Sequence, residues 1–279
     1  MTDNKAGESR QWLGRKTERW DIITPRQTDN LSATFAPFIP ESGFSEELLW
    51  LLAPDSEPQD ALGPDGHPKL GLYLPDMGFE RRMWAGGQIS FYAPVPVMET
   101  ITKISEIAAI TPKEGKSGNM VFVSVKHSYH AGATHIADEI QQIVYRQAVA
   151  QAAYQGGDRL PAYDRQSQWQ IKTNSTLLFR YSALTFNGHR IHYDADFAKN
   201  HEGHEGLMLH GPIQASWLMM LAKQHSGESL GKFTYRSVAP FICGQTAHVT
   251  IGQTETKISG TVQNETGQIT MTAQIELRK

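Results

Sequence analysis

The chain contains two series of segments with a two-residue alternation of apolar and polar side chains. In the first half these segments are residues 88–92, 99–107, 120–129 and 139–145. In the third of them, Val121, Val123 and Val125 alternate with Phe122, Ser124 and Lys126, so one face is more apolar than the other. Such alternation is typical of an antiparallel sheet with one covered face. The second series covers residues 175–182, 232–239, 246–252, 257–262 and 268–277.

Residues 211–226 predict a helix that is apolar round most of its circumference and is therefore buried. Pro212 marks its start and Gly227 its end. The first N–H groups of a helix lack intrahelical partners, and the helix dipole makes that end positive. This helix start is therefore suited to hold a carbonyl oxygen that gains negative charge. Residues 25–36 predict a second, weaker helix, and residues 53–71 form a loop long enough to cover a site.

A short internal repeat links the two series. Residues 93–100 (APVPVMET) align without gaps with residues 239–246 (APFICGQT), and the strands that follow have similar lengths and order. We expect a disordered tail (1–10), an N-terminal module (11–150), a linker (151–168) and a C-terminal module (169–279). Each module would contain an early strand, a helix and a meander of strands wrapped round that helix.

Composition narrows the function classes. Of 279 residues, 39% are hydrophobic and 20% are charged, and the net charge is −3, which gives no reason to expect nucleic acid or an anionic membrane as partner. No apolar run is long enough for a membrane span, and the polar N-terminus has no secretory signal pattern. The single cysteine, Cys243, fits a reducing cytoplasm and reads as a small buried hydrophobe rather than a nucleophile.

The candidate chemistry lies in residues 179–214. His192 is the candidate acid/base group, because an imidazole titrates near neutral pH. Its alternative is a structural histidine. The backbone N–H of Gly211 is the candidate oxyanion donor, because the absence of a Cβ lets an acyl group approach closely. An ordinary helix cap is the alternative there, and both can hold.

Residues 179–194 (FRYSALTFNGHRIHYD), followed by His210-Gly211-Pro212, resemble the motif of the MaoC-like, type 2 hydroxyacyl-thioester dehydratases. The resemblance implies an α+β double hotdog fold, with two tandem modules, and a thioester carbonyl held by the glycine amide. Residues 81–87 (RRMWAGG) and 62–67 are similar to the branch containing itaconyl-CoA and mesaconyl-C4-CoA hydratases. The N-terminal module lacks the residue 187–192 motif and is expected to be degenerate.

The resemblance implies an enzyme that adds water to an α,β-unsaturated acyl-CoA thioester. We expect itaconyl-CoA, converted to citramalyl-CoA, as the substrate, with mesaconyl-C4-CoA hydratase or (R)-3-hydroxyacyl-thioester dehydratase as the alternative. An acyl-CoA thioesterase is the alternative from a second enzyme class. Hotdog thioesterases commonly activate water with a carboxylate on the central helix, and residues 212–225 contain none, which disfavours this alternative. A module that binds acyl-CoA without catalysis remains open, because many members of the superfamily carry aspartate where this chain has Asn187. An amide cannot take a proton at neutral pH, so Asn187 would position water while His192 alone acts as base.

The remaining site candidates are polar or aromatic. Arg190 and Arg180 would pair with a carboxylate of the acyl group, or with a nearby acidic residue on the surface. Arg82, with its neighbour Arg81, would meet CoA phosphates or be solvated at a strand start. Trp84 is expected to pack in the protein, with stacking on the CoA adenine as the alternative. His189 and His210 are expected to contact substrate, whereas Asp194 reads as the cap of a short helix.

We expect no metal, because the run of His189, His201, His204 and His210 with Glu202 and Glu205 has no shared helix face. No redox cofactor is expected either. Assembly into a homo-oligomer is expected, since such assemblies are common.

Overall fold

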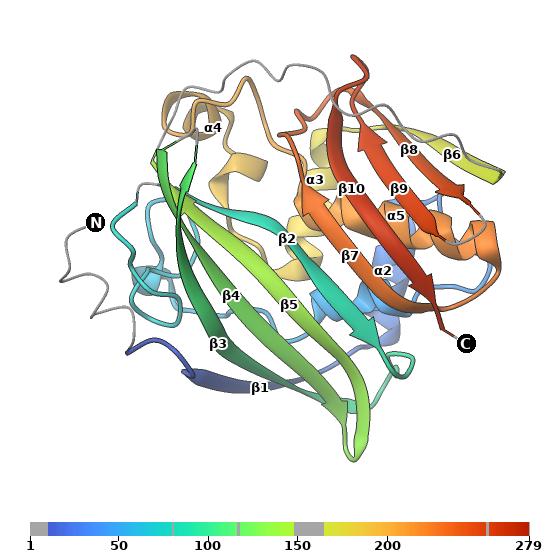
Figure 1. Cartoon of the computed structure of the whole chain (residues 1–279), viewed down its shortest axis with the longest axis horizontal. Helices are drawn as coiled ribbons and strands as arrows, with labels where there is room; N and C mark the ends of the chain where they lie inside the picture. The colour runs from blue at the N-terminus through green and yellow to red at the C-terminus, as the bar shows by residue number, and fades with distance from the viewer. Residues whose placement is uncertain (1–10, 80, 116–117, 148–164, 255–256, 279) are drawn as a thin grey trace.

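The computed structural model describes residues 11–79, 81–115, 118–147, 165–254 and 257–278. Ten strands of these residues form one antiparallel sheet in the order β1-β3-β4-β5-β2-β7-β10-β9-β8-β6 (Figure 1). The strands are β1 Lys16–Ile22, β2 Arg81–Phe91, β3 Thr100–Gly115, β4 Gly118–Ala131, β5 Thr134–Arg146, β6 Arg165–Lys172, β7 Leu230–Ser237, β8 Thr246–Gln253, β9 Ile258–Gln263 and β10 Ile269–Leu277.

The strand order repeats in the two halves of the chain. From the outer edge inward, the first half runs β1-β3-β4-β5-β2 and the second runs β6-β8-β9-β10-β7, with equivalent strands at equivalent places. The halves join where β2 pairs with β7, from Gly86 opposite Arg236 to Ser90 opposite Lys232. The predicted internal repeat is therefore visible as two five-strand units in one sheet, with the predicted α+β class.

Helix α5 (Gly211–Ser226) is the central helix of the second half, and it contacts all five strands of that half. Twelve of its 16 residues are buried, and Gly227 ends it in the left-handed conformation at φ 76°. Both the buried helix and its glycine stop were predicted. The burial of its apolar residues on every side stabilises the fold and fixes the position of the helix start.

The other helices are shorter. They are α2 Pro25–Phe35, α3 Ser175–Thr185, α4 Ala195–Asn200, and the 3-10 helices η1 Glu46–Leu51, η2 Gln59–Ala61 and η3 Arg190–His192. Helix α2 begins with a capping box in which Thr24 and Gln27 exchange hydrogen bonds, and it matches the helix predicted at residues 25–36. In the described part of the first half, only the short helices η1 and η2 lie between α2 and β2. A long central helix was predicted for both modules, but among the described residues only the second half has one, helix α5.

The prediction of a strand at residues 175–182 is wrong, because this segment is helix α3. Asn174 caps it by accepting a hydrogen bond from the N–H of Leu177 at 2.9 Å. Leu178 and Tyr181, three residues apart, are buried, whereas Phe179 is 68% exposed. The helical spacing of the buried positions therefore outweighs the strand-like composition.

An early strand was expected in each module, but the residue ranges of β1 and β6 were not predicted. Both lie at the edges of the sheet, where neither face is fully covered, so their sequences lack a clean apolar alternation. Strand β6 begins at Arg165, within the segment 151–168 expected to be a linker. Of the predicted linker, only residues 165–168 are described, and they belong to β6. The predicted tail 1–10 and residues 151–164 lie outside the described residues.

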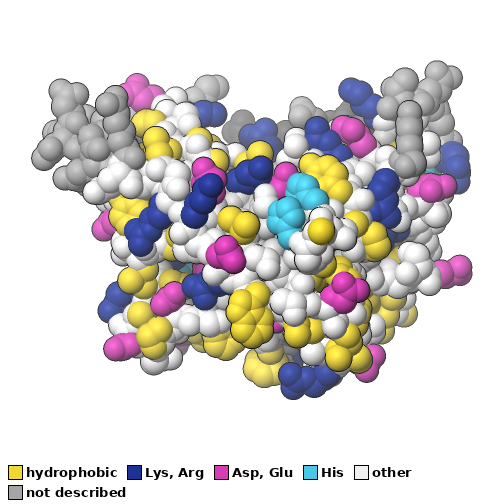
Figure 2. All heavy atoms as spheres, turned by 90° about the horizontal axis from the view of Figure 1, so that it is seen from below, with side chains coloured by type: hydrophobic (Ala, Val, Ile, Leu, Met, Phe, Trp, Pro, Cys, Tyr) yellow, Lys and Arg dark blue, Asp and Glu magenta, His cyan; other side chains and the backbone are white. Residues whose placement is uncertain are grey.

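The surface shows no dominant charge on the face seen in Figure 2, where acidic, basic and hydrophobic side chains are interspersed. This agrees with the small net charge of −3. None of the described helices is long and apolar enough to cross a membrane.

Candidate active site

A large cavity, of about 1840 Å³, is lined by residues from both halves of the molecule. Pockets for small molecules usually enclose about 300–1,000 Å³, so this one has room for a ligand as long as an acyl-CoA. The first half contributes residues such as His67, Arg82 and Trp84, and the second contributes His189, His192 and Gly211. The segment from α3 to the start of α5 therefore faces the loop before β2.

His192, the predicted acid/base group, is the last residue of η3 and is 7% exposed. Its Nδ1 donates to the carbonyl oxygen of Met208 at 2.8 Å, since a carbonyl can only accept. The neutral ring therefore carries its proton on Nδ1 and leaves the lone pair on Nε2. Burial, with a smaller contribution from His189, lowers the pKa of His192 to about 3, so the ring is an unprotonated base at neutral pH.

His210 fixes the plane of the His192 ring. The two imidazoles stack with their centroids 3.5 Å apart and their planes 15° apart. His210 is 1% exposed, its Nε2 lies 2.9 Å from the hydroxyl oxygen of Ser182, and burial lowers its pKa well below the usual value. His210 therefore supports His192 from behind and is not part of the cavity wall, contrary to the expectation that it contacts substrate.

Gly211 follows His210 directly and begins α5. Its N–H has no hydrogen-bond partner in the described part of the chain, and Pro212 has no N–H to offer. Gly211 lines the same cavity as His192. The predicted oxyanion donor and the predicted base thus share one cavity.

Trp84 explains why residue 211 is a glycine. A Cβ added to Gly211 would lie 2.6 Å from Cζ3 of the Trp84 indole and nearer still to Cε3. Trp84 is itself stacked on Tyr235, with centroids 4.5 Å apart, and lies edge-on to Trp50. The packing alternative for Trp84 is therefore the one that its contacts support, and the protein's own packing requires glycine at residue 211.

Gly211→Ala is expected to lower kcat/KM at least tenfold and to lower Tm. The added methyl must displace Trp84 or the start of α5, and overpacking a filled site costs about 1–3 kcal/mol. Steady-state kinetics and thermal melting of the variant would measure both effects. Trp84→Leu removes the indole that meets the methyl, so Gly211→Ala should cost less in that background; equal costs in both backgrounds would contradict the packing explanation.

Buried Glu139 accepts hydrogen bonds from Trp50 and Tyr235, the two aromatic residues that pack against Trp84. This residue of β5 has 0% exposure and accepts hydrogen bonds from Trp50 Nε1 at 3.0 Å and the Tyr235 hydroxyl at 3.0 Å. Tyr129 and Gln141 donate to it as well, at 3.3 and 3.1 Å. A buried carboxylate with four donors is well satisfied. Sequence reasoning missed this residue, for which an acid inside an apolar strand pattern was the one available signal.

Asn187 holds a turn. Its Oδ1 accepts a hydrogen bond from the backbone N–H of His189 at 2.9 Å. The preceding residue, Phe186, adopts the left-handed conformation at φ 50° that ends helix α3. Asn187 also lines the cavity, so the structure brings it to the same cavity as His192 with its oxygen already engaged.

Arg190 fastens two loops together. Its Nε and Nη2 donate to Asp194 Oδ2 at 3.1 and 2.7 Å, and its Nη1 donates to the carbonyl oxygen of Pro64 at 3.0 Å. Asp194 also caps α4 through the N–H of Phe197, as predicted. The ion-pair alternative for Arg190 therefore fits better than the expected pairing with an acyl carboxylate.

Arg180 lies on helix α3, and not on an entering strand as expected. Its Nη1 donates to the carbonyl oxygen of Ala33 in α2 at 3.0 Å. It is exposed and is not part of the cavity wall. The structure therefore does not support the prediction that Arg180 binds substrate.

Arg81 and Arg82, predicted at the CoA phosphates, both line the cavity. Arg81 is paired with Glu202 at 3.2 Å. Arg82 donates from Nη2 to the carbonyl oxygen of Pro68 at 3.0 Å and lies 3.6 Å from Asp65 Oδ2. Arg82 therefore lies beside a carboxylate that sequence reasoning did not single out.

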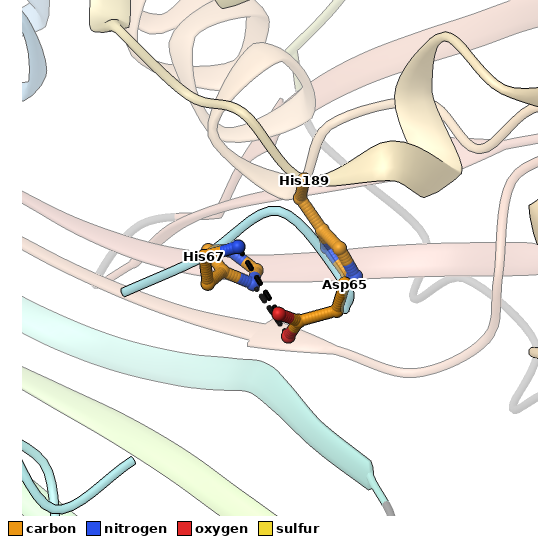
Figure 3. A group of neighbouring side chains, drawn as sticks. All are labelled: Asp65, His67 and His189. Carbon is orange, nitrogen blue, oxygen red and sulfur yellow. Dashed lines mark hydrogen bonds and ion pairs between the residues drawn. The ribbon is translucent and has the colours of Figure 1, made fainter. Parts of the chain in front are cut away.

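Asp65, His67 and His189 form a cluster of chelating side chains (Figure 3). One ligand atom from each lies within 4.8 Å of the others, so in the described part of the chain this set, and not the run from His201 to Glu205, could hold a cation. The His67 and His189 rings are 4.1 Å apart, and burial lowers the pKa of His189 to about 2. The expectation of no metal stays a prediction. For Asp65 and His67, the signal in the sequence was the high density of turn residues at positions 63–68 (GPDGHP), which predicts a tight loop.

Comparison with known proteins identifies the fold and the family. A solved structure described as a MaoC-like dehydratase matches with a TM-score of 0.71 at 12% identity, over 95% of this chain and 98% of that one. A Mycobacterium tuberculosis protein described as having a double hotdog fold matches with a TM-score of 0.58 at 10% identity, over 95% and 96% of the two chains. The repeated sheet and the buried helix therefore define a protein of the double hotdog class.

The hydroxyacyl-thioester dehydratase type 2 family matches residues 48–243. A mesaconyl-C(4)-CoA hydratase from Chloroflexus aurantiacus is 35% identical over 233 residues, which cover 82% of this chain and 83% of that protein. The chain belongs to the hydroxyacyl-thioester dehydratase type 2 family, as its motifs predicted. It is a hydro-lyase, an enzyme that adds water to an acyl thioester or removes it.

Proposed function

We propose that this enzyme hydrates mesaconyl-C4-CoA, an α,β-unsaturated thioester whose acyl group carries a free carboxylate. The single observation that carries the proposal is the 35% identity, over more than four-fifths of both chains, to a protein named for that reaction. Itaconyl-CoA, the substrate first expected from the sequence, becomes the alternative, because the comparison favours the mesaconyl thioester.

The proposed mechanism uses a neutral imidazole and a backbone amide. His192 Nε2, which carries a lone pair in the tautomer fixed by Met208, takes a proton from the attacking water. The oxygen of that water bonds to the β-carbon, and the electron pair of the double bond moves to the thioester oxygen. The Gly211 N–H at the positive end of α5 stabilises that charge. His192 then returns the proton to the α-carbon, so the atoms of one water are added.

Recognition of the substrate follows from the cavity wall. The free carboxylate of the acyl group lies on the carbon that water attacks, so its partner must be close to His192. Arg82 takes this role in the proposal, because it lines the cavity and its contacts to Pro68 and Asp65 both use Nη2. In Arg190, by contrast, Nε, Nη1 and Nη2 all donate hydrogen bonds to the protein. The reaction as proposed uses no redox cofactor.

The location and assembly of the enzyme are also proposals. The single cysteine, Cys243, is free and partly buried, which supports the reducing cytoplasm expected from the sequence. A homo-oligomer remains the expected assembly, and chromatography with light scattering would measure it.

A panel of three thioesters tests the proposed function. Purified enzyme is incubated with mesaconyl-C4-CoA, itaconyl-CoA and crotonyl-CoA, and the products are separated and weighed by mass spectrometry. We expect addition of one water, with the highest kcat/KM for mesaconyl-C4-CoA. A preference for crotonyl-CoA would contradict the carboxylate role, and release of free CoA would indicate a thioesterase. Binding without turnover would indicate a non-catalytic module.

A further inference from the structure

The loop that carries Asp65 and His67 is fixed in shape by its own backbone. The N–H of Gly63 donates to the carbonyl oxygen of His67 at 2.7 Å, and the N–H of Gly66 donates to Gly63 at 3.0 Å. Gly66 has a φ of 86°, a conformation that a side chain disfavours. This closed turn presents Asp65 and His67 together toward the second half of the molecule.

The second half holds this loop at short range. The N–H of Arg190 donates to the carbonyl oxygen of Asp65 at 2.9 Å, and its side chain donates to Pro64. Gly66 and Gly188 meet backbone to backbone, because a Cβ on Gly188 would lie 2.9 Å from the Gly66 oxygen, and one on Gly66 would collide with Gly188. The loop is thus attached to the same short segment that carries His189 and His192.

Asp65 sets the protonation of His67. Its Oδ2 lies 3.0 Å from His67 Nδ1, and its Oδ1 accepts from the His67 backbone N–H at 3.1 Å (Figure 3). The Asp65 carboxylate accepts in both contacts, so neutral His67 carries its proton on Nδ1. Its Nε2 keeps a lone pair for the cavity.

His192 has no such carboxylate. Its Nδ1 donates to the carbonyl oxygen of Met208, and the side-chain oxygen of Asn187 accepts a hydrogen bond from the backbone N–H of His189. A water that attacks carbon through a lone pair has two O–H groups to place. His192 Nε2 can accept one of them, and the second O–H needs another acceptor in the cavity. His67 lines the same cavity and contacts His189, which in turn lies edge-on to His192 with centroids 5.6 Å apart.

We propose that His67, oriented by Asp65, is a second catalytic residue whose Nε2 accepts a hydrogen bond from the attacking water. With both O–H groups held by His192 and His67, a lone pair of the water points at the β-carbon. One proton passes to His192 as the C–O bond forms and then goes to the α-carbon. The other proton stays on the oxygen and becomes the hydroxyl proton of the product, and this hydroxyl still donates its hydrogen bond to His67 Nε2.

This inference rests on the proposed hydration, and it gives each half of the chain one catalytic imidazole. Asp65 is a positioning residue in this scheme, because it acts through His67. The arrangement follows the logic of other carboxylate–imidazole pairs, in which the carboxylate selects the tautomer and strengthens the ring as an acceptor.

His67→Phe keeps a ring against His189 but removes the acceptor. We expect kcat to fall about 100-fold, the lower end of the usual contribution of a positioned acid/base group, with little change in KM or Tm. Asp65→Asn, which retains an acceptor oxygen but loses the charge, should lower kcat about tenfold. His201→Phe is the matched control, because this exposed histidine lies outside the cavity wall and its loss should leave kcat unchanged.

Asn187→Asp in the His67→Phe background provides a test that a structural role would fail. An aspartate can still accept the His189 N–H, and its second oxygen offers the water the acceptor that His67 supplied. We therefore expect Asn187→Asp to recover at least about a tenth of the lost kcat. Absence of any recovery, with the double variant folded, would overturn the shared role in holding water.

The remaining outcomes also decide the question. Wild-type kcat in His67→Phe would overturn the inference while the proposed function stands, whereas a wild-type enzyme that hydrates none of the three thioesters overturns both. If His67→Phe does not fold, Asp65→Asn decides, and an unchanged kcat there overturns the inference. Loss of wild-type activity on chelation, with recovery on adding zinc, would overturn it in favour of a cation at Asp65, His67 and His189.

Discussion

His192→Ala is expected to lower hydratase kcat by about 1,000-fold, within the range that a positioned general base contributes. The variant loses the Nε2 lone pair that takes the water proton, while the Gly211 amide and the cavity remain. The melting temperature should also fall, because the variant leaves the buried carbonyl oxygen of Met208 without its donor and removes the ring that contacts His210 and His189. A loss of kcat in protein that is still folded at the assay temperature therefore reports the missing base. Stopped assays with separated products would measure the loss.

The pH profile provides the control for this prediction. Since burial lowers the pKa of His192 to about 3, the base is neutral between pH 5 and pH 8. Wild-type kcat should therefore not fall through protonation of His192 as the pH drops from 8 to 5. His192→Gln, which preserves size and polarity, should be as inactive as His192→Ala; a loss smaller than about tenfold in either variant would exclude His192 as the base.

Lys223→Met is expected to lower the free energy of unfolding by about 3–5 kcal/mol, the usual cost of leaving buried charges unpaired. Lys223 is 5% exposed, and its Nζ lies 3.0 Å from Glu46 Oε2 and 2.8 Å from Glu47 Oε2. The two glutamates are 4% and 1% exposed, and burial raises the pKa of Glu47. Urea unfolding of the variant would measure the change.

A second variant separates the buried charge from the loss of packing. Lys223→Met combined with Glu46→Gln and Glu47→Gln removes the uncompensated charges and should regain much of the lost stability. Lys232→Met is the matched surface control, because Lys232 lies 3.9 Å from the exposed Glu276, and such pairs contribute about 0–1 kcal/mol. Equal losses for Lys223→Met and Lys232→Met would contradict the assignment.

The ion cluster also explains what replaces a central helix in the first half. Lys223 belongs to α5, whereas Glu46 and Glu47 belong to η1, so the cluster anchors the short 3-10 helix to the long helix of the other half. Glu46 Oε1 also accepts the N–H of Leu230 at the start of β7. The sequence contains no signal of this contact, because Lys223 is 177 and 176 positions away from Glu46 and Glu47.

The elements with strong periodicity could be predicted from the sequence. Helix α5, the two meanders and the repeat at residues 93–100 and 239–246 follow from apolar spacing and turn residues. Edge strands β1 and β6 could not, because a strand with no fully buried face needs no apolar alternation. Helix α3 was missed because its buried residues, Leu178 and Tyr181, are few and its exposed face carries Phe179.

The candidate site residues that the structure brings together are those that lie close to one another in the chain. His192 and Gly211 share one cavity as expected, and the Asp194 cap was readable from local spacing. The four-residue spacing of Arg190 and Asp194 was also a signal for their ion pair, and it weighed against a free guanidinium. Asp65, His67 and Glu139 were not singled out, since their partners come from another half or another strand and only the fold brings them together.

The contact between Gly66 and Gly188 limits how the two repeated units can diverge. Each position excludes a side chain because of a backbone in the other unit, so a change on one side is selected against through the other. A side chain at either position would therefore push the two loops apart, and so disturb the unit that does not carry it. The two five-strand units are thus no longer independent at this contact, even though each keeps its own strands.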